Sequence, residues 1–181
     1  MLTLSACQHA PVENNPNRVV IAKDITLQLL LPKNRFTTTQ KITAQYNNTQ
    51  HTVLMQVQAS PQAIVMAGLA PSGTRLFSLR FDGNTTDTWQ SPLFSLQQVS
   101  SAHFDARYAL ADFELATLDN ADLQSALPKN ARLTDTISNG MRVRELRRRN
   151  GEVLIHIEYR GLNTQYCHRE RHYCLQIETL P

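Results

Sequence analysis

The first half of the chain alternates between apolar and polar residues with a period of two. Residues 36–46, 51–59 and 75–81 each place large apolar side chains on one face and mainly polar side chains on the other. Residues 63–69 are apolar on both faces, and residues 85–89 fit a short return strand. Alternation of this kind is typical of half-buried β-strands. Turn-forming residues separate the segments, so the pattern predicts a meander of antiparallel strands.

The middle of the chain changes to the spacing of helices. The segment 102–116 carries residues at intervals of three and four that gather on one side of a helix. These residues are Phe104, Tyr108, Ala111 and Leu115. A second helix is expected over 120–127, because Asp122 lies near its start and Pro128 ends it.

Strands return after the helices. They are expected at 132–138, 141–149, 152–160 and 173–180. A sheet with one apolar face must bury that face, and the helices are the available cover. We therefore predict an α+β fold in which a strongly curved antiparallel sheet, a half-barrel, holds one or two helices as a lid over its concave face. This single domain is expected to span 19–181.

The apolar face of the meander is the candidate ligand site. It carries Phe36, Ile42, Tyr46, Val53, Met55, Val57, Phe77, Leu79 and Phe81. If the helices pack tightly on these side chains, the face is only a core. If the sheet is wider than the helices can fill, an apolar cavity remains for an acyl chain, and the first helix acts as its lid. The sequence slightly favours the core.

The first residues have the form of a bacterial lipoprotein signal. Residues 4–7 read Leu-Ser-Ala-Cys, a lipobox in which Cys7 becomes the acylated first residue of the mature chain. A basic segment and an apolar segment of about 7–15 residues should precede such a site, and only six residues without a basic one do so here. We expect residues 1–7 to be a truncated signal and the polar residues 8–18 to be a tether. The alternative is a chance Ser-Ala-Cys in a cytosolic protein.

Composition and cysteine spacing add to this picture. The net charge of +3 is too small to suggest nucleic acid as a partner, and no apolar run of about 18 residues is present to span a bilayer. Cys167 and Cys174 favour a disulfide across a hairpin, as expected in an oxidising periplasm. Free thiols, or a metal site that also uses His168 and His172, are the alternatives.

A basic cluster marks one expected hairpin, and its members are Arg142, Arg144, Arg147 and Arg148, with Arg149 beside them. Such a patch can meet anionic phospholipid or a carboxylate ligand. The favoured interpretation is an edge strand whose solvated charges prevent aggregation. No nucleophile elbow, phosphate-binding glycine loop or zinc-protease motif is present in the sequence. We therefore expect a protein that is not an enzyme and has no catalytic residue, cofactor or metal.

The chain resembles a family of small Gram-negative outer-membrane lipoproteins with a domain of unknown function, whose members are encoded beside aryl polyene pigment genes. The likeness runs through short motifs at 39–42, 73–79, 109–115, 144–146, 155–159 and 173–180, and their order is its specific part. Family members often carry a Trp-Pro pair after the helix, where residues 117–119 read Thr-Leu-Asp here. This departure concerns the packing of the helical lid.

That family is similar in turn to the lipoprotein localisation factors LolA and LolB, which are half-barrels with a helical lid over an apolar cavity. The resemblance implies an outer-membrane anchor facing the periplasm and a ligand that is an acyl chain, a polyene lipid or an acylated protein. It also implies a LolA-like carrier as a partner. The alternative function is a lipid-anchored scaffold that contacts an envelope or biosynthetic complex through the arginine hairpin.

Overall fold

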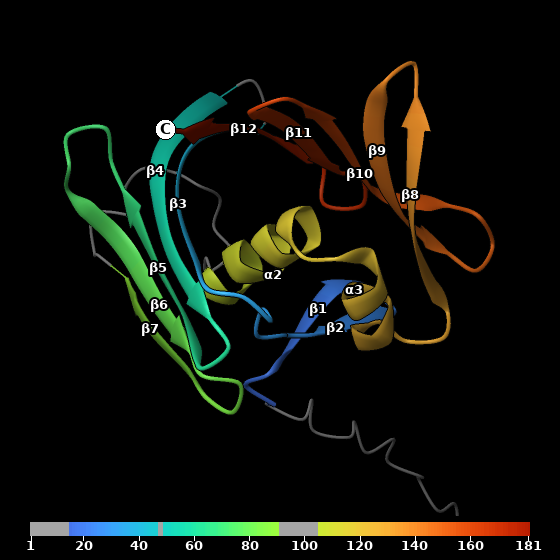
Figure 1. Cartoon of the computed structure of the whole chain (residues 1–181), viewed down its shortest axis with the longest axis horizontal. Coiled ribbons are helices and arrows are strands. Elements are labelled where there is room, and N and C mark those ends of the chain that lie inside the picture. Colours follow the sequence, from blue (N-terminus) through green and yellow to red (C-terminus); the bar gives the residue numbers. More distant parts are fainter. Residues whose placement is uncertain (1–14, 47–48, 91–104) are drawn as a thin grey trace, which may run out of the picture.

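A ten-stranded antiparallel sheet dominates the computed structural model, which describes residues 15–46, 49–90 and 105–181 (Figure 1). The strand order is β7-β6-β5-β4-β3-β12-β11-β10-β9-β8. The sheet is open, since β7 and β8 form its two edges. Strand β12 pairs with β3 and so joins a meander from the first half of the chain to one from the second half.

The strands follow the alternating segments of the sequence. In the first half they are β3 (Phe36–Tyr46), β4 (Thr49–Ser60), β5 (Ala63–Leu69), β6 (Arg75–Phe81) and β7 (Thr86–Gln90). In the second half they are β8 (Ala131–Ser138), β9 (Met141–Arg148), β10 (Val153–Arg160), β11 (Asn163–His168) and β12 (Tyr173–Leu180). The prediction of an antiparallel sheet in an α+β fold is confirmed. Strand β11 was not predicted, because among its residues only Tyr166 is a large apolar side chain facing the core.

Two helices follow β7 in the chain, α2 (Ala106–Thr117) and α3 (Asn120–Ala126). Asp105 caps α2, because its side chain accepts a hydrogen bond from the backbone N–H of Arg107. Leu118 has an extended backbone and ends the helix. Both helices were predicted, although residues 102–104 of the first prediction lie outside the described residues. No helix in the described parts of the chain is long and apolar enough to cross a membrane.

A second, two-stranded sheet precedes the large one. Strands β1 (Arg18–Ala22) and β2 (Ile25–Gln28) form a hairpin whose apolar side chains are buried, with the exception of the exposed Val20. Each strand is too short to stand out as a periodic segment, so the hairpin was not predicted. Its first residue, Arg18, is also the last residue of the expected tether.

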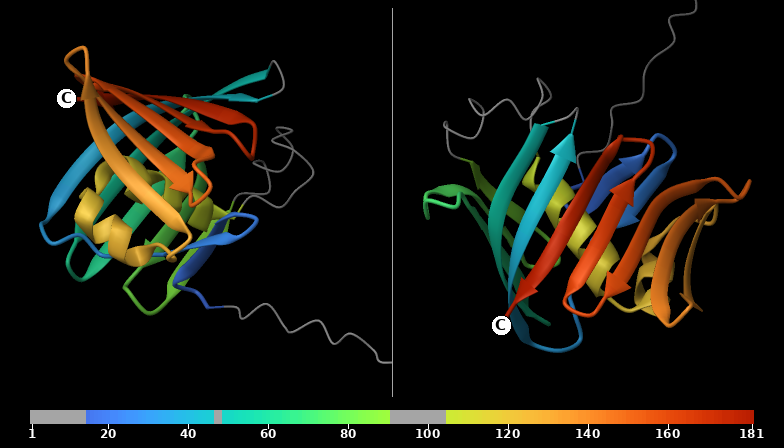
Figure 2. Two further views of the ribbon diagram at one scale, coloured as in Figure 1. Left: turned by 90° about the vertical axis from the view of Figure 1, so that its right-hand side faces the viewer. Right: turned by 90° about the horizontal axis from the view of Figure 1, so that it is seen from above.

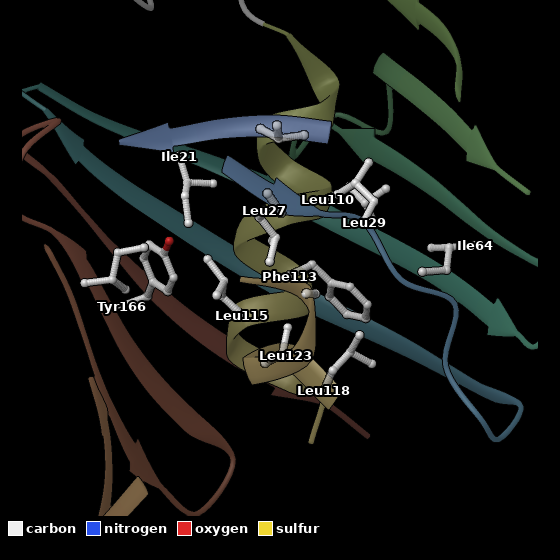
Figure 3. Close-up of a cluster of buried hydrophobic side chains, with 14 of the residues drawn as sticks. Ile21, Leu27, Leu29, Ile64, Leu110, Phe113, Leu115, Leu118, Leu123 and Tyr166 are labelled. Atoms are coloured by element: carbon white, nitrogen blue, oxygen red, sulfur yellow. The ribbon is translucent and has the colours of Figure 1, made fainter. Parts of the chain in front are cut away.

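The core lies between the two sheets. Helix α2 passes between the β1–β2 hairpin and the inner face of the large sheet, and α3 lies on the same face (Figures 1 and 2). Leu27 of β2, Leu110 and Leu115 of α2 and Leu123 of α3 point into this layer and are fully buried (Figure 3). Burial of each such side chain stabilises the fold by about 1.5–3 kcal/mol. The predicted lid helix is therefore a central element, covered on its outer side by β1 and β2.

Candidate functional site

The inner face of the large sheet is sealed at both ends and partly accessible in its middle. On one side, Met66 and Phe81 are buried under the helices, as are Leu146 and Ile157 on the other. Met55 and Val57 of β4 and Ile177 of β12 are buried as well. Among them, the inward-facing positions from Phe36 to Ala44 of β3 are only partly buried, and so are Val53 of β4, Thr164 of β11, and Leu175 and Thr179 of β12. We call these central positions the inner strip.

The inner strip has an apolar and a polar part. Its apolar members are Phe36, Ile42, Ala44, Val53 and Leu175, and its polar members are Thr38, Gln40, Thr164 and Thr179. Ile42 lies directly opposite Val53 on one side and Ile177 on the other. Since successive residues of a strand point to opposite faces, these register pairs place the members of the strip on one surface.

One side of α2 faces the inner strip. Tyr108, Ala109, Asp112 and Ala116 follow helical spacing and are all partly buried. Contacts flank the strip on both sides, since Asp112 reaches β11 and β12, and the ring of Phe113 stacks on Phe36 of β3 with centroids 6.2 Å apart. Two of the four residues are alanines, which fill little of the space above the strip.

Asp112 ties the middle of α2 to the sheet. The hydroxyl of Tyr166 donates to its Oδ1 at 2.5 Å, and the hydroxyl of Tyr173 donates to its Oδ2 at 2.6 Å. Burial raises the pKa of Asp112 to about 6, although both phenol hydrogen bonds and the charge of Arg171 act to lower it. The guanidinium of Arg171 lies 3.9 Å from the ring centroid of Tyr108 and so fixes the start of the helix as well.

Arg144 and Tyr159 hold the end of α2. Arg144 is fully buried, and its Nη1 donates to the backbone oxygens of Leu115 and Leu118 at 2.7 and 2.8 Å. The hydroxyl of Tyr159 donates to the backbone oxygen of Ala116 at 2.8 Å. The last carbonyls of a helix have no partner within it, so these side chains supply the bonds that the helix lacks.

Asp135 completes the Arg144 site. Arg144 donates to both of its carboxylate oxygens, at 2.7 and 3.0 Å, and Arg142 donates to one of them at 2.7 Å. Burial alone would raise the pKa of Asp135, but the hydrogen bonds and charges of the two arginines hold it at about 2. The charge of Arg144 is thus neutralised inside the protein.

Glu114 is a second buried acid on α2. Its two carboxylate oxygens accept the backbone N–H of Leu30 at 3.2 and 3.1 Å. Burial raises the pKa of Glu114 well above its ordinary value, and the Leu30 bond opposes that shift. This contact fastens α2 to the segment that follows β2, on the side away from the inner strip.

The basic cluster of the β8–β9–β10 region is compensated by acids. Arg147 donates to Glu145 at 2.5 Å. Arg148 pairs with Asp24 and Glu152, each at 2.8 Å, and with Glu170. Arg142 and Arg144 pair with Asp135, as described above. Every predicted member of the cluster therefore has a carboxylate partner. This arrangement leaves little uncompensated charge for an external anion.

The predicted disulfide between Cys167 and Cys174 is present, with an S–S distance of 2.07 Å. The two residues are direct partners in the β11–β12 ladder. Nearby His168 is buried; its Nε2 donates to the backbone oxygen of Ile21 at 2.8 Å, and its Nδ1 accepts the N–H of Arg171 at 3.3 Å. Both ring nitrogens are therefore engaged, and no group of three potential metal ligands occurs within the described residues.

Loss of the disulfide is expected to lower the free energy of unfolding by about 2–3 kcal/mol, because the bond reduces the conformational entropy of the unfolded chain. Urea unfolding with and without dithiothreitol measures this difference. A Cys167→Ser/Cys174→Ser variant serves as the control, since its stability should not respond to the reductant. An unchanged midpoint for the parent chain under full reduction would contradict the prediction.

The predicted cavity and lid residues divide between core and strip. The core holds Met55, Val57, Phe77, Leu79, Phe81, Ala111 and Leu115, all buried. The partly accessible ones are Phe36, Ile42, Val53 and Tyr108. Tyr46 is the last residue of β3, while Phe104 and Cys7 lie outside the described residues. Asp112 and Gln40 were not predicted as site residues, although Gln40 interrupts the apolar side of 36–46 and was a usable signal.

A shallow pocket of about 390 Å³ lies apart from the inner strip, between β7 and the start of α2. Its lining residues are Pro16, Thr86, Thr88, Trp89, Gln90, Asp105, Ala106 and Arg107. Most of these side chains are polar. The pocket therefore suits an acyl chain less well than the inner strip does.

The matched segment of the chain includes every member of the inner strip except Phe36. The sequence model of the family described as Protein of unknown function (DUF3261) matches residues 37–181. The chain belongs to this family. In this member of DUF3261 the match begins within β3 and covers both helices, whereas the β1–β2 hairpin precedes it. A comparison with curated proteins gave no match.

Proposed function

We propose that this chain is a non-enzymatic, lipid-anchored outer-membrane protein that holds a hydrophobic acyl, lipid or polyene-lipid ligand between α2 and the centre of the large sheet. The observation that carries the proposal is the partial accessibility of the inner strip between two sealed ends of the same sheet face. In this proposal the sheet acts as a LolB-like half-barrel and α2 as its lid. Apolar burial drives binding, at about 25 cal/mol per Å² of apolar surface.

The contacts between α2 and the strands on one side of the strip support a lid that can move. Asp112, Arg144 and Tyr159 make polar bonds across this boundary. Water replaces these hydrogen bonds when they break, at a net cost of about 0.5–1.5 kcal/mol for the neutral Tyr159 bond and about 1.5–3 kcal/mol for each bond of a charged group. Polar contacts of this kind can exchange their partners for water when α2 moves, which two apolar surfaces cannot do.

The anchor and the partner belong to the same proposal. Acylation of Cys7 would hold the domain at the periplasmic face of the outer membrane, with residues 8–18 as the tether. A LolA-like carrier would then deliver an acylated protein or a lipid to the inner strip. A domain tethered to the membrane lies close to lipids and acylated proteins, so the proposed anchor and the proposed ligand are consistent with each other.

The direct test is binding of N-phenyl-1-naphthylamine, which fluoresces in apolar surroundings, to the Cys7→Ser chain produced without acylation. We expect saturable fluorescence. Ile42→Glu should weaken it at least about tenfold, because a carboxylate in the strip must be desolvated. Val65→Glu, on the exposed side of β5, is the matched control and should bind as the parent does.

Absence of probe binding by a folded parent chain, together with absence of copurifying lipid, would contradict the proposal. Val57 and Leu79 are unsuitable positions for this test, because both are fully buried in the core. A charge there would report on folding rather than on the ligand. Circular dichroism of Ile42→Glu and Val65→Glu verifies that both variants retain the fold.

The scaffold hypothesis is the weaker one. It assigns partner binding to the arginine hairpin, whose side chains already have carboxylate partners within the protein. Charge reversal at Arg142, the most exposed of the four, separates the two hypotheses. Loss of a partner complex with probe binding intact would favour the scaffold.

A further inference from the structure

We propose that the ligand carries an uncharged hydrogen-bonding group, such as a hydroxyl, ester or amide, and that four polar side chains in the inner strip recognise it. We call them the polar patch, and they are Thr38, Gln40, Thr164 and Thr179. This inference rests on the proposed function and specifies the ligand of the same site. It distinguishes an amphiphile with a neutral polar group from a plain hydrocarbon chain and from a fatty acid anion.

The polar patch is contiguous across three strands. Gln40 of β3 lies directly opposite Thr179 of β12. Thr38 is two residues before Gln40 and therefore points to the same face. Thr164 of β11 lies opposite Ile177, which is two residues before Thr179. Neighbours in this arrangement are about 5–8 Å apart, within the reach of one small polar group.

The chemistry of the patch is unusual for the inner face of a sheet. The four side chains face α2, and all are partly buried. Among the described residues none of the four has a side-chain hydrogen-bond partner within the protein. A glutamine amide alone offers two donors and an acceptor, and each threonine hydroxyl adds both functions. Polar groups in such a position need a partner, which here is water or a ligand.

The surroundings of the patch favour a neutral group over an anion. Tyr159, opposite Thr164, has the guanidinium of Arg142 stacked on its ring at 4.5 Å, and that arginine is already paired with Asp135. The acid on the facing side of α2 is Asp112, whose two oxygens accept phenol hydrogen bonds. A carboxylate head would lose its hydration here without gaining a free cation. A hydroxyl or ester group can replace its hydrogen bonds to water with hydrogen bonds to the polar patch, and its desolvation costs much less free energy than that of a carboxylate.

Competition between ligands of the same chain length tests the inference. The Cys7→Ser chain is loaded with N-phenyl-1-naphthylamine at pH 8, and the probe is displaced with 1-monooleoylglycerol, oleate or 1-octadecene. We expect 1-monooleoylglycerol to displace the probe at about tenfold lower concentration than either competitor, as two hydrogen bonds would provide. Gln40→Leu/Thr179→Val should remove this advantage, so that the three competitors displace the probe at similar concentrations. Gln58→Leu, on the exposed side of β4, should retain it.

The outcomes separate this inference from the proposed function. If the parent chain binds the probe but the three competitors displace it equally, or if oleate is the strongest, the inference is overturned and the hydrophobic site stands. If the parent chain does not bind the probe, both fail. The ranking on the parent chain decides the matter even if the double variant does not fold.

Discussion

Replacement of Arg144 by methionine is expected to lower the free energy of unfolding by about 2–4 kcal/mol, because two buried helix-end carbonyls lose their donor at about 1–3 kcal/mol each. Arg144 is fully buried and joins Asp135 to the backbone oxygens of Leu115 and Leu118. Methionine fills a similar volume but leaves two helix-end carbonyls without their donor, and Asp135 keeps only Arg142 as a partner. The loss is therefore electrostatic rather than a loss of packing.

Arg142→Met is the matched control, because Arg142 binds the same carboxylate from a position whose side chain is 45% exposed. An exposed pair contributes about 1 kcal/mol or less, so this variant should remain close to the parent. Urea unfolding followed by circular dichroism gives both values. Similar losses for the two variants would show that burial does not distinguish the two arginines and would refute the argument.

The contrast between Arg142 and Arg144 also shows how far a pattern of residues can predict this fold. The alternation along 141–149 indicates a strand and places the two arginines on one face, but apolar residues occur on both faces of that segment. The pattern therefore cannot say which face is inward. The register with β10 settles the matter, since it puts Arg144 opposite the buried Ile157.

The strands with a clear alternation were predictable, whereas β1 and β2 were not. Residues 36–46 and 51–59 each turn one face toward the interior, and the alternation of apolar and polar residues in the sequence reflects this requirement. The β1–β2 hairpin has strands of only five and four residues and no comparable signal. It nevertheless covers α2, which explains why the predicted lid is a central helix.

The candidate site was predictable only in part, for a related reason. Alternation identifies inward positions such as Ile42 and Val57 equally well. Only the placement of the helices in the folded protein determines that Val57 is buried while Ile42 stays partly accessible. The polar contacts of Asp112 depend on residues more than 50 positions away in the chain. Long-range partners of this kind leave no signal in the neighbouring sequence, so the sequence around Asp112 looks the same as that around a solvent-exposed acid in a helix.

The stability of the protein is expected to depend on pH through two buried groups that act in opposite directions. Burial raises the pKa of Asp112 from 3.8 to about 6, so its contribution is complete below pH 3.8 and is lost as the pH rises through 6. Burial lowers the pKa of His168 from 6.5 to about 4, so its contribution is complete above pH 6.5 and is lost as the pH falls through 4. Each shift corresponds to about 3 kcal/mol at 1.36 kcal/mol per pKa unit.

Single variants separate these two contributions. Between pH 7 and pH 4, the stability of the parent relative to Asp112→Asn should rise by about 2–2.5 kcal/mol, and its stability relative to His168→Gln should fall by about 2.5–3 kcal/mol. Urea unfolding of the three proteins at pH 4, 5, 6 and 7 measures both differences. Glu114 and the other acids titrate in all three proteins and cancel from the comparison. Parallel stability curves for the parent and either variant would mean that the replaced side chain is not the buried group that titrates, and the contact of α2 with β11 and β12 would then have to be reconsidered.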